Sequence, residues 1–180
     1  MRLILALFLV IPGLAFAASD SGWPSTTKPP KPTATTKSCK GVTVWDAKTQ
    51  KCVKPKGAAL DSETLYQAAR ELAYAGRVLD AQGVLGAMPD QSEDRVLTYW
   101  GFTHRKLGHV EQAQAYYDRA IAQNPDNILA RSYMAQGYVQ AGRMDAAIAQ
   151  WREIKARGGT GTWAETSLRQ AIRSGSTSDY

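Results

Sequence analysis

The sequence is poor in the residues that most often perform catalysis or bind metal ions. Its 180 residues include only two histidines, His104 and His109, and two cysteines, Cys39 and Cys52. Neither histidine is flanked by cysteines or carboxylates at metal-ligand spacing. No Gly-x-Ser-x-Gly, phosphate-loop or dinucleotide-binding motif occurs. Catalysis needs convergent groups, so we expect no enzyme activity, no catalytic or metal-binding residue and no cofactor.

Long apolar runs are equally scarce. The longest covers residues 3–18, follows Arg2 and is broken by Pro12-Gly13. It is shorter than the roughly 20 residues that span a bilayer, and Ala15-Phe16-Ala17 forms a small-x-small cleavage site. This pattern predicts a signal peptide over residues 1–17. We therefore expect cleavage near Ala17, a periplasmic or secreted protein, and no transmembrane segment in the mature chain.

Acidic residues are lacking in the N-terminal part of the chain. The formal net charge is +6, and residues 18–56 contain eight lysines against two aspartates, whereas residues 57–180 contain 13 Lys and Arg against 14 Asp and Glu. The basic character therefore belongs to the N-terminal segment and not to the rest of the chain. An exported protein also meets little nucleic acid, so we expect none as a partner. The lysines are compatible with contact to anionic envelope polymer or a lipid surface, or with general solubility.

Residues 18–38 are dominated by Ser, Thr, Pro and Lys. Such a segment buries too little apolar surface to offset its ordering entropy, which predicts a disordered linker. The polar residues 174–180 are expected to form a flexible tail.

Cys39 and Cys52 enclose twelve residues, of which Val42 to Trp45 favour a strand and the next four a turn. In an oxidising compartment two cysteines this close are expected to pair, which predicts a disulfide-closed hairpin over residues 39–56. The bond can serve stability alone, or the hairpin can present Trp45 as a platform for a sugar ring or a peptide. The Cys-x₅-Trp-Asp pattern resembles one half of the peritrophin-type chitin-binding motif over 14 residues.

From residue 61 onward the apolar residues follow a helical period. Gly76, Gly108 and Gly142 lie 32 and 34 residues apart, and each ends one helical run and begins another. A period of this length indicates stacked helix pairs, because one pair alone cannot cover its apolar face. The expected helices after the first, which starts near Asp61, span residues 77–88, 94–107, 110–123, 128–141, 144–156 and 163–172.

The middle pair has the most specific pattern. Leu97-x-x-Trp100-Gly101-x-x-His104, Ala113-x-x-x-Tyr117-x-x-Ala120 and Pro125 together resemble a tetratricopeptide repeat (TPR) of the exported bacterial type. The units on either side resemble it more loosely. The resemblance implies an all-α fold: a right-handed α-solenoid of about three TPR-like helix pairs plus a C-terminal capping helix, over residues 61–173.

The same resemblance implies binding of protein or peptide partners along a concave groove lined by the first helix of each pair. The candidate groove residues are Arg70, Tyr74, Arg95, Phe102, Arg105 and Lys106. Their basic and aromatic character suits an acidic or aromatic peptide. His104 stands where the repeat usually has tyrosine, so we expect it to pack against the neighbouring helix or to form a hydrogen bond between helices.

Two functions from different classes follow. The first is an exported, non-catalytic scaffold or adaptor that binds partners through the repeat groove. The second is a cell-envelope or polysaccharide-binding module that uses the Cys39–Cys52 hairpin and Trp45. The first depends on the groove residues, and the second depends on Trp45 and the disulfide.

Overall fold

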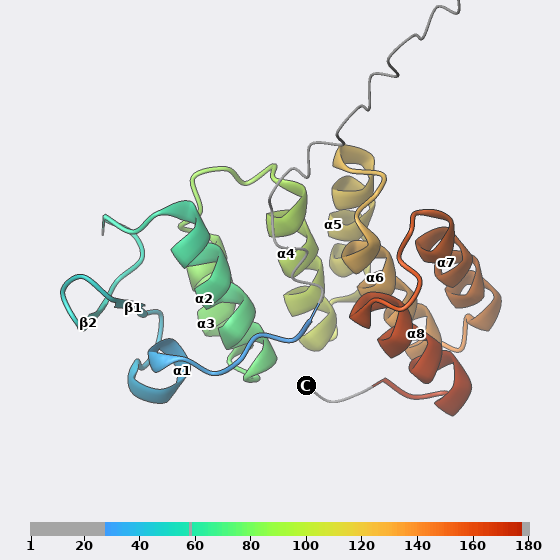
Figure 1. Ribbon diagram of the computed structural model, residues 1–180, viewed down its shortest axis with the longest axis horizontal. Helices are drawn as coiled ribbons and strands as arrows, with labels where there is room; N and C mark the ends of the chain where they lie inside the picture. The colour runs from blue at the N-terminus through green and yellow to red at the C-terminus, as the bar shows by residue number, and fades with distance from the viewer. Residues whose placement is uncertain (1–27, 58, 178–180) are drawn as a thin grey trace, which may run out of the picture.

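The computed structural model describes residues 28–57 and 59–177, so the expected signal peptide and residues 18–27 lie outside the described part. Three helix pairs follow one another along the chain and a last helix packs beside them, which confirms the predicted all-α stack (Figure 1). The pairs are α2 (Ser62–Tyr74) with α3 (Val78–Leu85), α4 (Asp94–Lys106) with α5 (Val110–Gln123), and α6 (Ile128–Gln140) with α7 (Met144–Ala156), and the last helix is α8 (Trp163–Ser174).

Side chains cap several helices at the start positions that the sequence predicts. Asp61 accepts a hydrogen bond from the Thr64 amide at the start of α2, and Asn127 accepts one from the Ala130 amide at the start of α6. Such caps satisfy backbone amides that have no partner within the helix. Between α4 and α5, Gly108 has φ of +80°, a conformation that L side chains rarely adopt. The same geometry recurs at the equivalent glycines of the other two pairs.

Small residues let the helices of the middle pair approach closely. A Cβ atom added to Gly101 would lie 2.6 Å from ring atoms of Tyr117, which is fully buried. Ala113 and Ala120 are also buried at this contact. The core therefore uses the large-beside-small packing that the sequence pattern predicts. His104 stacks on Tyr116 with ring centroids 5.3 Å apart, which confirms its packing role.

The part of the expected linker that the structure describes differs from the prediction. Residues 28–33 run along α2, and Ala34–Ser38 forms a short helix, α1. Thr33 caps α1, and the side chain of Thr35 is buried. Composition alone does not predict that this segment is ordered. The segment is held in place by polar contacts with a buried carboxylate of α2 and not by burial of apolar side chains.

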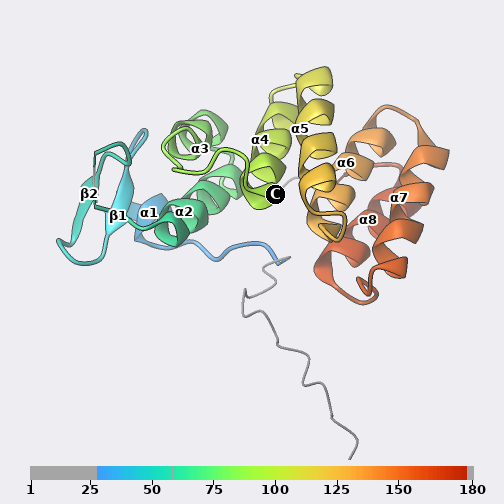
Figure 2. The ribbon, with the colours of Figure 1, turned by 90° about the horizontal axis from the view of Figure 1, so that it is seen from above.

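The disulfide hairpin forms as predicted, one or two residues later than expected. The strands β1 (Val44–Asp46) and β2 (Lys51–Val53) pair in antiparallel fashion, and Cys39 is bonded to Cys52. Figure 2 shows the hairpin at one end of the stack, next to α1 and α2. Val44 is buried, and Arg77 donates to the Cys39 and Gly41 carbonyls at 2.9 and 2.8 Å. The hairpin thus covers the open end of the first pair.

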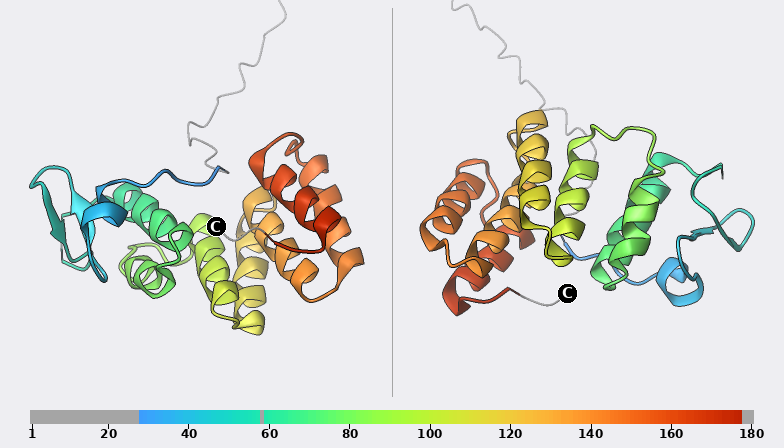
Figure 3. Two further views of the ribbon diagram at one scale, coloured as in Figure 1. Left: turned by 90° about the horizontal axis from the view of Figure 1, so that it is seen from below. Right: turned by 180° about the vertical axis from the view of Figure 1, so that it is seen from behind.

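At the opposite end, α8 closes the stack (Figure 3). Leu168 and Ala171 of α8 are buried against the third pair, and the Ser132 hydroxyl donates to the Ala164 carbonyl at 2.7 Å. Polar residues follow α8 up to Thr177, whose hydroxyl accepts a hydrogen bond from Gln140. Within residues 28–57 and 59–177, no helix has the length and apolar character needed to cross a membrane.

Candidate functional site

The concave face of the stack, lined by α2, α4 and α6, holds an extended segment of the chain itself. Residues 28–33 run across α2 toward α4 on this face (Figures 2 and 3). Arg70, almost fully buried, donates from Nη2 to the Lys28 carbonyl at 2.8 Å. Pro29, Pro30 and other residues of the segment line a cavity of about 220 Å³ together with Tyr74 and Ala75 of the helix end. The face therefore accommodates an extended, proline-containing chain.

Glu71 fixes the far end of this segment. Its buried carboxylate accepts hydrogen bonds from the Thr33 amide at 2.6 Å and the Thr33 hydroxyl at 2.7 Å. It also accepts from the amide and hydroxyl of Thr36, at 3.1 and 2.5 Å. A buried carboxylate is tolerated only when it is well supplied with donors. The sequence analysis did not identify Glu71, because the segment that satisfies it lies 35 or more positions earlier in the chain.

Behind this segment an aromatic cluster fills the middle of the concave face. Tyr74 stacks on Phe102 with ring centroids 5.5 Å apart, and Phe102 lies 4.8 Å from Tyr133. The Tyr74 and Tyr133 hydroxyls are 2.5 Å apart. The ring of Trp163, at the start of α8, has its centroid 6.1 Å from that of Tyr74, so α8 reaches the end of α2. Burial, together with neighbouring tyrosines, raises the pKa of Tyr133, which keeps its hydroxyl protonated and able to donate.

This region contains four of the six predicted groove residues, but they do not form an open surface. The four are Arg70, Tyr74, Phe102 and Lys106. Phe102 is completely buried, so it supports the face and cannot itself touch a partner. Tyr74 remains half-buried at the edge of the proline-lined cavity. The side chain of Lys106 is half-buried, with Nζ 5.9 Å from the Phe102 ring. The expected contact surface is therefore narrower and less basic than the residue types suggested.

Arg95 is neutralised by neighbours that sequence reasoning did not pair with it. It forms ion pairs with Glu63 of α2 and with Glu93, the residue that precedes α4. Its guanidinium carbon lies 4.3 Å from the centroid of the buried Tyr66 ring. Arg95 thus links the first two helix pairs. A role for this residue in attracting an acidic peptide loses its support.

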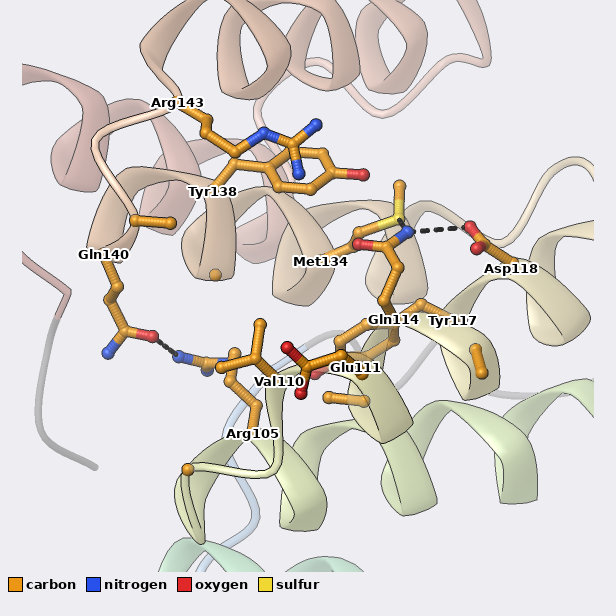
Figure 4. Close-up of a pocket in the computed structure, with 15 residues that line it drawn as sticks. Arg105, Val110, Glu111, Gln114, Tyr117, Asp118, Met134, Tyr138, Gln140 and Arg143 are labelled. Atoms are coloured by element: carbon orange, nitrogen blue, oxygen red, sulfur yellow. Dashed lines mark hydrogen bonds between the residues drawn. The ribbon is translucent and has the colours of Figure 1, made fainter.

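Arg105 lies in the wall of a lateral cavity, with its guanidinium carbon 5.6 Å from the centroid of the Phe102 ring. This cavity, of about 750 Å³, lies between α4 and α5 on one side and α6 on the other (Figure 4). Arg105 Nη1 donates to Gln140 Oε1 at 2.8 Å, and its Cδ atom lies over Gly137. Val110, at the start of α5, is largely exposed at the cavity. The repeat pattern predicted Arg105 as a residue of the concave groove, and the structure places its side chain in the wall of this lateral cavity.

The hairpin presents Trp45 to the first helix pair. Trp45 is half-buried, and its amide donates to the Thr35 hydroxyl at 3.3 Å. It lines a shallow cavity of about 450 Å³ with Thr64 and Gln67 of α2. The indole therefore does not project freely from the hairpin, as a platform for stacking would require, but part of it borders an accessible hollow.

Metal binding and acid–base chemistry find little support among the described residues. Outside residues 1–27, 58 and 178–180, no group of three or more His, Cys, Asp or Glu side chains is arranged to hold a metal ion. The Nδ1 atoms of His104 and His109 are 3.3 Å apart. Burial, and then the neighbouring His109, lower the pKa of His104. The pair fits an inter-turn hydrogen bond on the side of the stack.

Comparison with known proteins agrees with this geometry. Residues 104–159 match the tetratricopeptide repeat family. The match begins inside α4, includes α5 and α6 and ends after α7, so it covers the third helix pair and the second half of the middle pair. Neither the curated proteins nor the solved structures contain a match to the chain. The repeat suggests a scaffold for protein–protein interaction, and no catalytic family matches.

Proposed function

We propose that the protein is an exported, non-catalytic adaptor that binds an extended segment of a partner protein along its concave face. The observation that supports this is the extended segment of residues 28–33 already held there. Two of its contacts are made to backbone groups, the Lys28 carbonyl by Arg70 and the Thr33 amide by Glu71. Any extended peptide offers such groups, so the same two side chains suit a partner segment as well.

The concave face favours an extended, proline-containing ligand over a strongly acidic one. Arg95 is already paired with two carboxylates, and Phe102 is covered. What remains accessible next to the segment is the edge of Tyr74 and the cavity that Pro29 and Pro30 line. Proline rings pack well on aromatic side chains, and a polyproline-type segment loses little entropy on binding.

Residues 28–33 would compete with such a partner. A tethered segment has an effective concentration in the millimolar range when its linker is short. A partner must therefore displace it or occupy the part of the face that it leaves open. Release of the segment is expected to increase partner binding.

Export is the second part of the proposal. It is supported by the signal-peptide pattern of residues 1–17 and by the Cys39–Cys52 bond, since such bonds persist in oxidising compartments. The lysine-rich N-terminal segment is compatible with a location at an anionic envelope surface.

The test is a crosslinking pulldown from envelope extract, with the full chain as bait. A synthetic peptide with the sequence of residues 28–37 should release the captured protein, and Thr33→Ala bait, in which the segment loses its hydroxyl contact to Glu71, should capture more of it than wild-type bait. Arg70→Ala should lower capture at least about 10-fold, because it removes a charge-assisted contact to the bound backbone. Glu63→Gln, also on α2 but outside the segment contacts, is the matched control. Capture that neither the peptide nor Arg70→Ala changes would contradict binding at the concave face.

The polysaccharide-binding alternative has one supporting observation, the shallow cavity beside Trp45. It predicts that the chain is retained on cell-wall polymer and that Trp45→Ala abolishes this retention. The concave-face proposal predicts instead that Trp45→Ala bait captures the same protein as wild-type bait. The two proposals therefore differ in the outcome of a single variant.

A further inference from the structure

The lateral cavity between the second and third helix pairs is separate from the face that holds residues 28–33. Its volume of about 750 Å³ is within the range of sites that bind small molecules. Most of its wall is apolar, including Val110, Ala113 and Met134. The wall also contains a buried cation, Arg105, and a buried phenol, Tyr117.

The guanidinium of Arg105 is only partly satisfied. One nitrogen, Nη1, donates to Gln140. The other two, Nε and Nη2, are buried and have no hydrogen-bond partner among the described residues. Nε–H and Nη2–H lie on the same edge of the guanidinium plane, and this edge matches the two oxygens of a carboxylate. The unpartnered part of Arg105 is therefore a preformed bidentate donor.

A second unpartnered donor lies close to this edge. The Tyr117 hydroxyl is buried next to the Arg105 guanidinium, and no hydrogen bond of good geometry reaches it in the described part of the chain. Burial raises the pKa of Tyr117 to about 12, while the nearby Arg105 guanidinium acts in the opposite direction. The phenol therefore stays protonated at neutral pH and can donate a hydrogen bond.

No carboxylate of the described chain neutralises Arg105. Its positive charge is about nine-tenths buried, yet none of the ion pairs within residues 28–57 and 59–177 includes it. Among the acidic residues at the cavity, Asp118 accepts from Gln114 and Glu111 is exposed. The Phe102 ring, 5.6 Å from the guanidinium carbon, offers a cation–π contact but no negative charge. A buried charge without a counter-ion is costly, so the site favours an anion.

We propose that this cavity binds a small organic acid with an apolar body. The carboxylate would accept two hydrogen bonds from Arg105 and a third from Tyr117. The apolar body would lie along Ala113, Met134 and the ring of Tyr138 toward the cavity mouth. Figure 4 shows Arg105 and Tyr138 on different sides of the same hollow. A shift of the Val110 side chain, which is exposed at the cavity, would give the acid access to the buried donors.

The test uses the full-length oxidised chain and two matched probes, hexanoate and its neutral analogue hexanamide. Binding is followed by nitrogen-15 NMR at the Arg105 Nε–Hε group and the Gly137 amide, which lies beside the arginine stem. We expect saturable shifts of both signals with hexanoate. Hexanamide should bind at least about 10-fold more weakly, because charge-assisted hydrogen bonds are about twice as strong as neutral ones.

Variants assign the binding to the proposed edge. Arg105→Gln should lower hexanoate affinity at least about 10-fold, and Arg105→Lys should lower it less, since it keeps the charge but loses the planar pair of donors. Arg152→Gln removes an exposed charge that does not line the cavity and should change affinity less than about 2-fold. If Arg105→Gln fails to fold, the comparison of hexanoate with hexanamide on the wild-type chain still tests the proposal.

Three results would overturn the proposal: no saturable shift with hexanoate at millimolar concentration, equal affinity for acid and amide, or hexanoate binding that survives in folded Arg105→Gln. N-acetylglutamate amide serves as a further probe. Its binding in place of hexanoate would assign the cavity to an acidic side chain of a protein partner and would exclude the small-acid assignment. None of these outcomes depends on the concave face.

Discussion

Gly101 of α4 and Tyr117 of α5 are in direct contact across the middle helix pair. A Cβ atom at Gly101 would lie 2.6 Å from two ring atoms of Tyr117 and 3.0 Å from a third. Tyr117 is only 2% exposed, so protein atoms surround most of the ring. This contact sets the distance between the two helices and also holds Tyr117 at the lateral cavity.

Gly101→Ala should therefore destabilise the fold. Overpacking typically costs about 1–3 kcal/mol, which exceeds the gain of up to about 1 kcal/mol in helix propensity. Urea unfolding followed by circular dichroism measures the difference. The matched control is Gly86→Ala, because a Cβ there meets no atom closer than 3.4 Å and the backbone has φ of −64°. A Gly101→Ala protein as stable as the wild type would show that the helices can separate at little cost.

Glu71→Gln should loosen residues 33–36 without unfolding the repeats. The carboxylate accepts four hydrogen bonds from Thr33 and Thr36, and hydrogen bonds to a charged group contribute about 1.5–3 kcal/mol each. We expect the Thr33 and Thr36 amides to exchange hydrogen at least about 10-fold faster, since even one such bond corresponds to that factor. Glu63→Gln should leave these amides unchanged. Unaltered exchange in Glu71→Gln would show that contacts other than those of Glu71 keep the segment in place.

Stability should decrease as pH falls below the ordinary pKa of histidine. The pKa of His104 is lowered by burial and by His109, so the unfolded chain binds a proton more readily than the folded chain does. The contribution of His104 to stability is therefore present above a pH of about 6.5 and is lost as pH falls through the folded-state value. Urea midpoints at pH 7.5 and pH 5 measure the change, and His104→Gln should reduce it. A pH dependence that is equal in both proteins would assign the effect to other groups.

Removal of the disulfide should release the hairpin and leave the helices folded. The bond joins residues 13 positions apart, and a loop of this size contributes about 3 kcal/mol by loop-closure entropy. With both cysteines changed to serine, we expect rapid amide exchange at Val44 and Val53 and a red shift of Trp45 fluorescence. Far-UV circular dichroism should change little, because all the long helices lie outside the hairpin. Loss of most helical signal would show instead that the hairpin is needed to cap the stack.

The sequence by itself determined the helix pairs. Apolar periodicity, the turn glycines and the small-beside-large pattern around Gly101 are local or act between adjacent helices, and each helix from α4 onward begins at the predicted residue. Cys39 and Cys52 lie close enough along the chain for their pairing to be predicted too. These features depend on sequence separations of about one repeat or less, within which backbone geometry limits the possible contacts.

Only the tertiary structure decided which of the predicted groove residues are accessible. Phe102 is covered because Tyr74 and Tyr133, from helices on either side, close over it. Arg95 is paired and Arg105 is left without a carboxylate, although both are arginines on the same helix. The difference lies in what the neighbouring helices place opposite each side chain. Contacts of this kind, like that between Glu71 and Thr33, join positions that are distant in the sequence. They depend on how the helices pack against one another, which no local sequence pattern determines.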